Sequence, residues 1–163
     1  MIGVIIRILI LGAIVVLIAC AIGLFIMAGV AQSHDVVPIP LPPSTYVAST
    51  EPMSDFSDAF IAPMNYSTFA NIDRVAQQAF HRGDKEVFRD EHEVAYEGRK
   101  YGLSYVVSYI LTKDTAPQTL VVATTMKVVD EKKRARYLLM MLKPIHRSLI
   151  PYLLDRMVIL APD

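Results

Sequence analysis

The sequence has little of several residue types on which many sites and folds depend. Among its 163 residues there is one cysteine, Cys20, and there is no tryptophan. A single cysteine excludes an intrachain disulfide framework and a cysteine-based zinc site. Net charge is also lacking, because 16 Lys and Arg residues balance 16 Asp and Glu residues. This balance argues against nucleic-acid binding, which needs a basic face or stripe.

The common signatures of catalysis and of metal or phosphate binding are missing as well. No HxH or HExxH spacing relates the four histidines, which are His34, His81, His92 and His146. No glycine-rich phosphate loop and no Gly-x-Ser-x-Gly nucleophile elbow is present. We therefore predict no metal, no cofactor and no catalytic residue, and enzyme activity is the less favoured interpretation.

Apolar residues are concentrated near the N-terminus. The 23 residues from Ile8 to Val30 include no charged residue and no Asn, Gln, Ser or Thr. As a helix this run would be about 35 Å long, which exceeds the roughly 30 Å hydrocarbon core of a bilayer. We predict a transmembrane anchor in residues 1–31, which crosses the membrane with residues 8–30. Arg7 is the only basic residue before the run, so the positive-inside rule predicts a cytoplasmic N-terminus and an external C-terminal domain, periplasmic in a two-membrane bacterium.

Two processing events compete with a permanent anchor. Residues 17–20, Leu-Ile-Ala-Cys, are similar to a bacterial lipobox, in which Cys20 would be acylated. Residues 29–31, Gly-Val-Ala, have the small-residue spacing of a signal-peptidase site. The apolar run continues past Cys20 and exceeds the usual apolar core of a signal peptide, so an uncleaved anchor is favoured.

Residues 32–52 hold five of the ten prolines and no glycine. Proline fixes φ and lacks an N–H group, so this composition predicts an extended and stiff spacer; a proline-rich ligand for a partner module is the alternative. Residues 53–163 then form the folded domain. We predict a short helix or turn at Met53–Phe60 and a helix that ends at Phe80 near Gly83. An amphipathic helix is predicted from Ile145 to about Ile159, with Pro144 at its start and with Pro151 either beginning a second segment or kinking it. Between the helices, residues rich in Val, Ile, Tyr and Thr predict four antiparallel strands, at about 86–96, 101–111, 119–129 and 135–142.

The resulting fold class is α+β, with a curved antiparallel sheet of about four or more strands that grips a long C-terminal helix. Residues 143–154, which begin Lys-Pro-Ile-His-Arg, resemble the Pro-Phe-His-Arg signature of domain-of-unknown-function family 2867, with Ile145 in place of the usual Phe. Residues 55–60, residues 102–108 and the pair Thr124-Thr125 support this resemblance. It implies a START-like (SRPBCC, helix-grip) domain that binds a lipid or another hydrophobic ligand, and it implies no assigned reaction.

Alternation along the strands predicts the side chains that face the interior. Glu97 to Lys100 is predicted as a four-residue hairpin loop, which places His92 opposite Tyr105 and Asp90 beside Val107. In the strand at 119–129, Lys127 should face solvent, so the interior set is Leu120, Val122, Thr124, Met126 and Val128. Convergent polar groups on an apolar face are typical of a ligand site, and the candidates are Asp90, His92, Tyr105, Tyr109, Met126 and His146.

Three interpretations of the Asp90 and His92 pair stay open: a polar anchor for an amphipathic ligand, a pair for general acid–base work, and a cluster that satisfies its own hydrogen bonds. His146 could also serve only to fix the strand-to-helix turn, through a hydrogen bond between its ring and a backbone carbonyl. The basic residues 132–136 fit a solvated hairpin tip, or a contact with anionic lipid headgroups. The favoured function is a membrane-anchored module that binds a small hydrophobic or amphipathic molecule, and the alternative is a structural protein of the cell envelope with a filled core.

Overall fold

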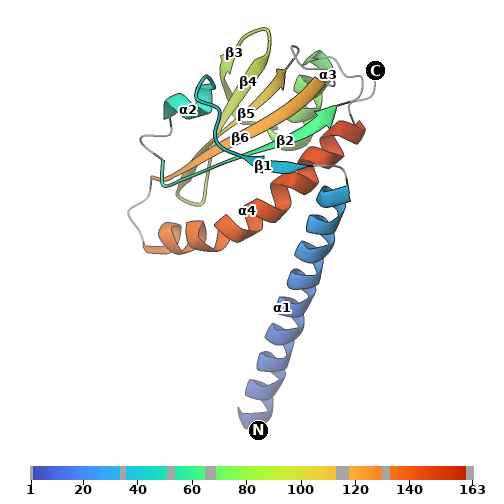
Figure 1. The fold of residues 1–163 in the computed structure, drawn as a ribbon. Helices are drawn as coiled ribbons and strands as arrows, with labels where there is room; N and C mark the ends of the chain where they lie inside the picture. The colour runs from blue at the N-terminus through green and yellow to red at the C-terminus, as the bar shows by residue number, and fades with distance from the viewer. Residues whose placement is uncertain are drawn as a thin grey trace.

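The computed structural model describes residues 2–33, 36–50, 54–64, 69–112, 118–129 and 133–160. It confirms an α+β fold in which a C-terminal helix packs on one face of an antiparallel sheet (Figure 1). Within these residues the sheet has six strands, in the order β1-β2-β6-β5-β4-β3. The strand bounds are β1 (Val37–Ile39), β2 (Phe56–Met64), β3 (Lys85–Arg89), β4 (Glu93–Lys100), β5 (Leu103–Thr112) and β6 (Gln118–Val128).

The centre of the hairpin between β4 and β5 lies three residues later than the centre of the predicted loop. Lys100 pairs with Leu103, and the two turn residues, Tyr101 and Gly102, have φ values of 54° and 81°. Two successive positive φ values belong to a two-residue type I′ turn, whose twist matches that of the flanking strands. The prediction of a loop at 97–100 is therefore wrong, and Tyr96 pairs with Val107 rather than with Tyr101.

The predicted strand at 86–96 is two strands joined by a tight turn. The Oδ1 atom of Asp90 accepts hydrogen bonds from the backbone N–H groups of His92 and Glu93, at 2.7 and 2.6 Å. An aspartate that bonds the backbone two and three residues ahead stabilises a turn. Asp90 and His92 are both exposed there, so their predicted inward position is wrong.

The helix predicted before the strands is confirmed as α3 (Phe69–Val75), which continues as the π-helical turn η2 (Ala76–Phe80). The last helix, α4 (Lys133–Leu160), is longer than predicted and begins where a fourth strand was expected. That strand prediction is wrong because burial follows the helical spacing: Ala135 and Leu139 are buried while Tyr137 is exposed. The expected basic hairpin tip is wrong from Lys133 onward, while residues 130–132 lie outside the described residues.

Pro144 and Pro151 both lie inside α4, so Pro144 does not begin the helix as predicted. A proline cannot donate the hydrogen bond to the residue four positions earlier, and it bends a helix. Figure 1 shows α4 changing direction along its length as it follows the sheet.

The expected spacer contributes to the folded domain. Val37 of β1 pairs with Ile61 of β2 at the edge of the sheet, where a strand tolerates proline because outward N–H groups have no partner. The short helix α2 (Tyr46–Thr50) follows, with Val47 fully buried. The spacer prediction is therefore wrong for residues 36–50. The short helix predicted at Met53–Phe60 is also wrong from Phe56 onward, because β2 begins there, and residues 51–53 lie outside the described residues.

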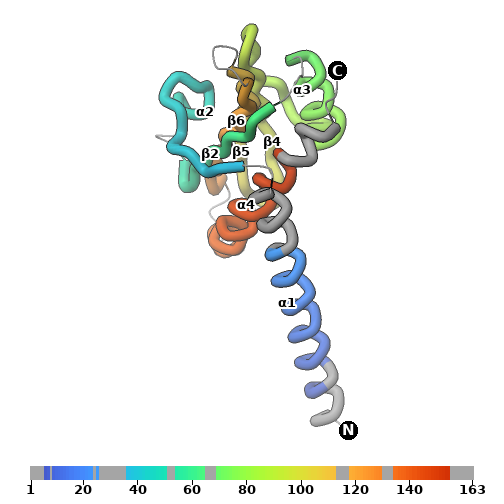
Figure 2. Tube along the Cα trace, turned by 45° about the vertical axis from the view of Figure 1, so that its right-hand side comes forward, coloured from blue at the N-terminus to red at the C-terminus, as the bar shows by residue number. Residues whose placement is uncertain are grey.

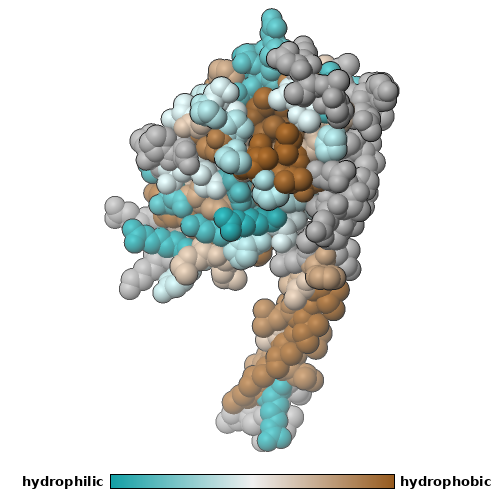
Figure 3. Space-filling model, viewed as in Figure 1, coloured by the Kyte–Doolittle hydropathy of each residue, from teal (hydrophilic) through white to brown (hydrophobic). Residues whose placement is uncertain are grey.

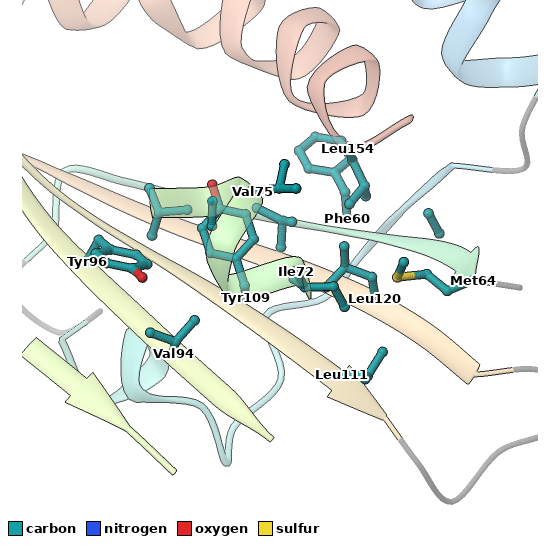
Figure 4. Packing of buried hydrophobic residues seen from close by; sticks show 14 residues of the cluster. Phe60, Met64, Ile72, Val75, Val94, Tyr96, Tyr109, Leu111, Leu120 and Leu154 are labelled. Carbon is teal, nitrogen blue, oxygen red and sulfur yellow. The ribbon is translucent and has the colours of Figure 1, made fainter. Parts of the chain in front are cut away.

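The main hydrophobic core lies between the sheet and the helices α3 and α4. Figure 4 shows Leu154 of α4 next to Phe60 of β2, above Tyr109 of β5. A second, smaller cluster covers the opposite face of the sheet, where Val47 packs on Ala59 and Ala123. Both faces of β6 are therefore buried in the middle of the strand.

One long helix, α1 (Ile2–Ser33), precedes the domain and leaves it on the side of α4 in both views (Figures 1 and 2). Its described surface is predominantly apolar, with a hydrophilic side chain toward the N-terminal end (Figure 3). Counted over the residues whose side chains are described, no helix is both long and apolar enough to cross a membrane. The helix is confirmed, and its role as an anchor stays a prediction.

Candidate functional site

A cavity of about 250 Å³ lies between the inward face of the sheet and the second half of α4. Strands β5 and β6 form its floor and α4 forms its roof, while the end of η2 closes one side. It is lined by Phe80, His81, Tyr105, Val107, Tyr109, Val122, Thr124, Met126, His146, Ile150, Leu153 and Leu154. No lining residue is an Asp, Glu, Lys or Arg, so the described wall is apolar with a few neutral polar groups.

His81 is the centre of a hydrogen-bonded cluster at one end of the cavity. Its Nδ1 atom lies 2.9 Å from Oδ2 of Asp84, and its Nε2 atom lies 2.7 Å from the hydroxyl of Tyr109. The imidazole ring also stacks on Tyr96, with 4.9 Å between centroids and 4° between planes. Burial lowers the pKa of His81, and the neighbouring Asp84 opposes that shift. Burial likewise raises the pKa of Tyr109.

Tyr105 joins the same cluster through Asp84. Its hydroxyl donates to the carboxylate, with the two oxygens of Asp84 at 3.1 and 3.0 Å. Burial, together with the hydrogen bond to Asp84, raises the pKa of Tyr105 to about 12. The ring of Tyr105 crosses Gly98 on the neighbouring strand, where a Cβ atom would overlap both the ring and Asp84. Gly98 is therefore the residue that allows Tyr105 to reach Asp84.

His146 and Thr124, unlike the residues of this cluster, are buried without hydrogen-bond partners among the described residues. His146 is only 6% exposed and Thr124 only 1%, and both line the cavity. Within the described part of the chain, neither ring nitrogen of His146 nor the hydroxyl of Thr124 has a hydrogen-bond partner. Burial lowers the pKa of His146 to about 4, against a smaller opposing effect of Asp58. The imidazole is therefore neutral at pH 7, and it offers one donor and one acceptor.

The position of His146 follows from α4 rather than from a turn. His146 lies one helical turn after Leu142 and one before Ile150, on the side of α4 that faces the sheet. Its ring meets Phe56 of β2 edge-on, with 5.3 Å between centroids. The expected bond from His146 to a backbone carbonyl is not found among the described residues.

Four of the six predicted site residues meet at the cavity: Tyr105, Tyr109, Met126 and His146. Asp90 and His92 do not, because they form the exposed turn between β3 and β4. His81, Asp84 and Thr124 were absent from the predicted site, although Thr124 was placed on the inward face. The spacing of His81 and Asp84 around Gly83 was the available signal, since Gly83 has a φ of 94° and reverses the chain between them.

Comparison with known proteins gives no family assignment. The sequence matches no protein-family model and no curated protein sequence. The resemblance to domain-of-unknown-function family 2867 therefore stays a prediction.

Proposed function

We propose that the protein is a membrane-anchored binding module that holds a small amphipathic molecule between its sheet and α4. The observation that carries this proposal is the pair of unpartnered polar side chains, His146 and Thr124, on the wall of an apolar cavity. A buried polar group without a partner costs about 1–3 kcal/mol. A ligand that brings a hydrogen-bonding group to this pair would recover that free energy.

The wall of the cavity also favours a particular ligand chemistry. A charged ligand group would find no opposite charge among the described lining residues, and burying an unpaired charge is costly. Since a water molecule occupies about 30 Å³ in the liquid, a volume of 250 Å³ suits a ligand of about eight non-hydrogen atoms. We therefore favour a small neutral molecule with an apolar body and one hydroxyl, amide or carbonyl group. A START-like relationship would agree with such a ligand.

The anchoring part of the proposal rests on α1. Residues 8–30 carry no charge, and large apolar side chains such as Leu17 and Phe25 are exposed along the helix. An apolar surface of this length is unfavourable in water and favourable in a bilayer. The N-terminus would be cytoplasmic and the domain external, with lipidation at Cys20 or cleavage after Ala31 as the alternatives.

Native mass spectrometry of the full chain, released from detergent micelles, tests the binding proposal. We expect a bound molecule that survives purification, or uptake of added octanol in preference to octanoate, because octanoate would bury a carboxylate. Ile150→Trp, which projects a large ring into the cavity, should abolish binding. Leu149→Trp is the matched control on the same helix, since Leu149 does not line the cavity.

Two results would contradict the binding proposal. A clean apo mass together with no uptake of octanol would favour the alternative, a structural or interaction protein of the cell envelope. Equal binding by the Ile150→Trp variant and the unmodified chain would place the ligand elsewhere. Binding that falls in His146→Leu and in Thr124→Val would assign the ligand's polar group to this pair.

A further inference from the structure

The solvent-facing side of the first half of α4 is apolar along its centre. Tyr137, Met140 and Met141 are exposed by 65%, 68% and 66%, and Pro144 is exposed next to them. Residues three and four positions apart lie on the same side of a helix, so these side chains form one continuous stripe. We name the stripe of Tyr137, Met140, Met141 and Pro144 the outer face of α4.

Basic residues border this outer face. Residues 133–154 include five Lys and Arg residues and no Asp or Glu. Arg136 and Arg147 are exposed on one border and Arg134 on the other. Beside Met140, a surface groove is lined by the basic side chains of Lys127, Arg136 and Lys143. Asp55 also lines the groove, so the charge there is positive by two.

Part of this basic border is already bound within the domain. The Nε atom of Arg147 lies 3.2 Å from Oδ2 of Asp58, and Lys143 Nζ donates to the backbone oxygen of Asp55 at 3.3 Å. Lys143 also lies over the ring of Phe56, 5.6 Å from its centroid. Arg134 and Arg136 are therefore the better residues with which to test a role of the charge.

The fold places the outer face on the same side of the domain as α1. The backbones of α1 and α4 are in contact, and both views show α1 leaving the domain past α4 rather than past the far face of the sheet (Figures 1 and 2). At the lower edge of the domain, where α4 lies, apolar and strongly hydrophilic side chains stand next to each other (Figure 3).

We propose that the outer face of α4 lies on the surface of an anionic lipid bilayer, with Tyr137, Met140 and Met141 among the headgroups. A helix with an apolar centre and basic borders is the usual form of an interfacial helix. The surface would give the domain a second membrane contact besides α1, and it therefore rests on the anchoring part of the proposed function. Each basic residue near an anionic surface contributes about 1 kcal/mol, which corresponds to roughly five-fold in the docked population.

A fluorescent label on the outer face tests this proposal with the full chain. Cys20 is the only cysteine, so Cys20→Ser with Met140→Cys gives a single site for an environment-sensitive nitrobenzoxadiazole dye. The labelled chain is reconstituted into vesicles of phosphatidylcholine alone and of equal parts phosphatidylcholine and phosphatidylglycerol. Glu91→Cys supplies the matched control. The β4–β5 turn lies beside α4, where Leu103 packs on Leu139, whereas Glu91 lies in the β3–β4 turn at the other end of β4.

We expect the label at position 140 to shift its emission to the blue in the anionic vesicles and to lose quenching by aqueous iodide. The label at position 91 should show neither change. Replacing Arg134 and Arg136 by Gln should lower the ratio of chains with α4 on the bilayer to chains with α4 away from it. Each charge removed should lower this ratio by about five-fold. High salt should have the same effect, because it screens exposed charges.

Co-flotation of the protein with vesicles in high salt separates this proposal from the anchor itself. A chain that floats with both kinds of vesicle, but whose label at position 140 stays exposed to iodide, refutes the contact of α4 and leaves the anchor standing. Failure to float refutes the anchor. A label at position 140 that is protected in detergent alone, together with a doubled particle mass, would assign the outer face to a second copy of the chain and overturn the proposal.

Discussion

Replacing His146 by Leu tests whether the unpartnered imidazole in the cavity is a cost to the unliganded fold. Leucine has a similar volume and no polar atom, so the substitution removes two buried nitrogens without partners and leaves little new cavity. Removal of unsatisfied polar atoms should raise the free energy of unfolding by about 1–3 kcal/mol at pH 7. A large loss of stability would instead mean that the ring makes contacts that leucine cannot replace.

The pH dependence gives a sharper form of the same test. The pKa of His146 falls from 6.5 to about 4 on folding, because burial disfavours the charged ring. Between these two values the unfolded chain binds a proton that the folded protein does not bind. The free energy of unfolding therefore decreases as the pH falls from about 6.5 to about 4, and the total loss is about 3 kcal/mol. Above pH 6.5 His146 does not lower the free energy of unfolding. Below pH 4 the ring is protonated in both the folded and the unfolded state, so the loss grows no further.

Urea unfolding of the full, unliganded chain in mild detergent measures this difference. Tyrosine fluorescence can follow the domain, because the chain has eight tyrosines and no tryptophan. The gap in stability between His146→Leu and the unmodified chain should widen by about 3 kcal/mol from pH 7 to pH 4. His92→Gln, which removes an exposed imidazole, is the control and should leave the curve unchanged. A constant gap across this pH range would refute the buried and neutral state of His146.

Three further substitutions, one of them with a matched control, test the surrounding structure. Gly98→Ala should lower the free energy of unfolding by about 1–3 kcal/mol, because the new methyl group displaces Tyr105 from Asp84; an unchanged urea midpoint would contradict this close approach. Tyr109→Phe should cost about 1–3 kcal/mol by leaving Nε2 of His81 unpaired, whereas Tyr137→Phe, at an exposed site, should cost nothing measurable in the same titration. Arg89→Ala removes the 2.9 Å ion pair with Asp73, yet it should cost less than about 1 kcal/mol because the pair is solvent-screened; a thermal melt with a larger loss would show that this pair fixes β3 to α3.

The sequence predicted the interior of the strands better than their ends. On β6 the inward set was correct, since Leu120 is buried and Val122, Thr124 and Met126 line the cavity. The charge of Lys127 fixed the register there, because a lysine on the inward side would be unpaired. At residues 97–100, by contrast, charged side chains led to a wrong prediction of a loop. They are polar and resemble a loop, but Arg99 and Lys100 are exposed at the end of β4, where a strand carries charge without cost.

The turn chemistry explains why the register of Asp90 and His92 could not be predicted. A type I′ turn is normally signalled by Asn-Gly, Asp-Gly or Gly-Gly, and this chain has Tyr101-Gly102. The centre of the turn lies three residues later than predicted, so the partner of Tyr96 moves by six residues, from Tyr101 to Val107. The bulge in β3 between Glu86 and Phe88 changes the alternation once more before the Asp90 turn. Asp90 and His92 missed the site because the predicted strand ends at their turn, whereas Val94 and Tyr96 of β4 lie in the core as predicted. Tyr105 and Tyr109, counted within β5, also kept their face.

The two buried histidines of the cavity bring these results together. His81 finds Asp84 and Tyr109 within hydrogen-bond distance, so folding alone satisfies its ring. His146 is carried into the cavity by α4, and neither of its ring nitrogens has a hydrogen-bond partner among the described residues. A core built only for packing would be more stable with an apolar side chain at position 146. The imidazole is therefore a cost in the unliganded protein, and a hydrogen bond from a bound ligand is the interaction that would offset it.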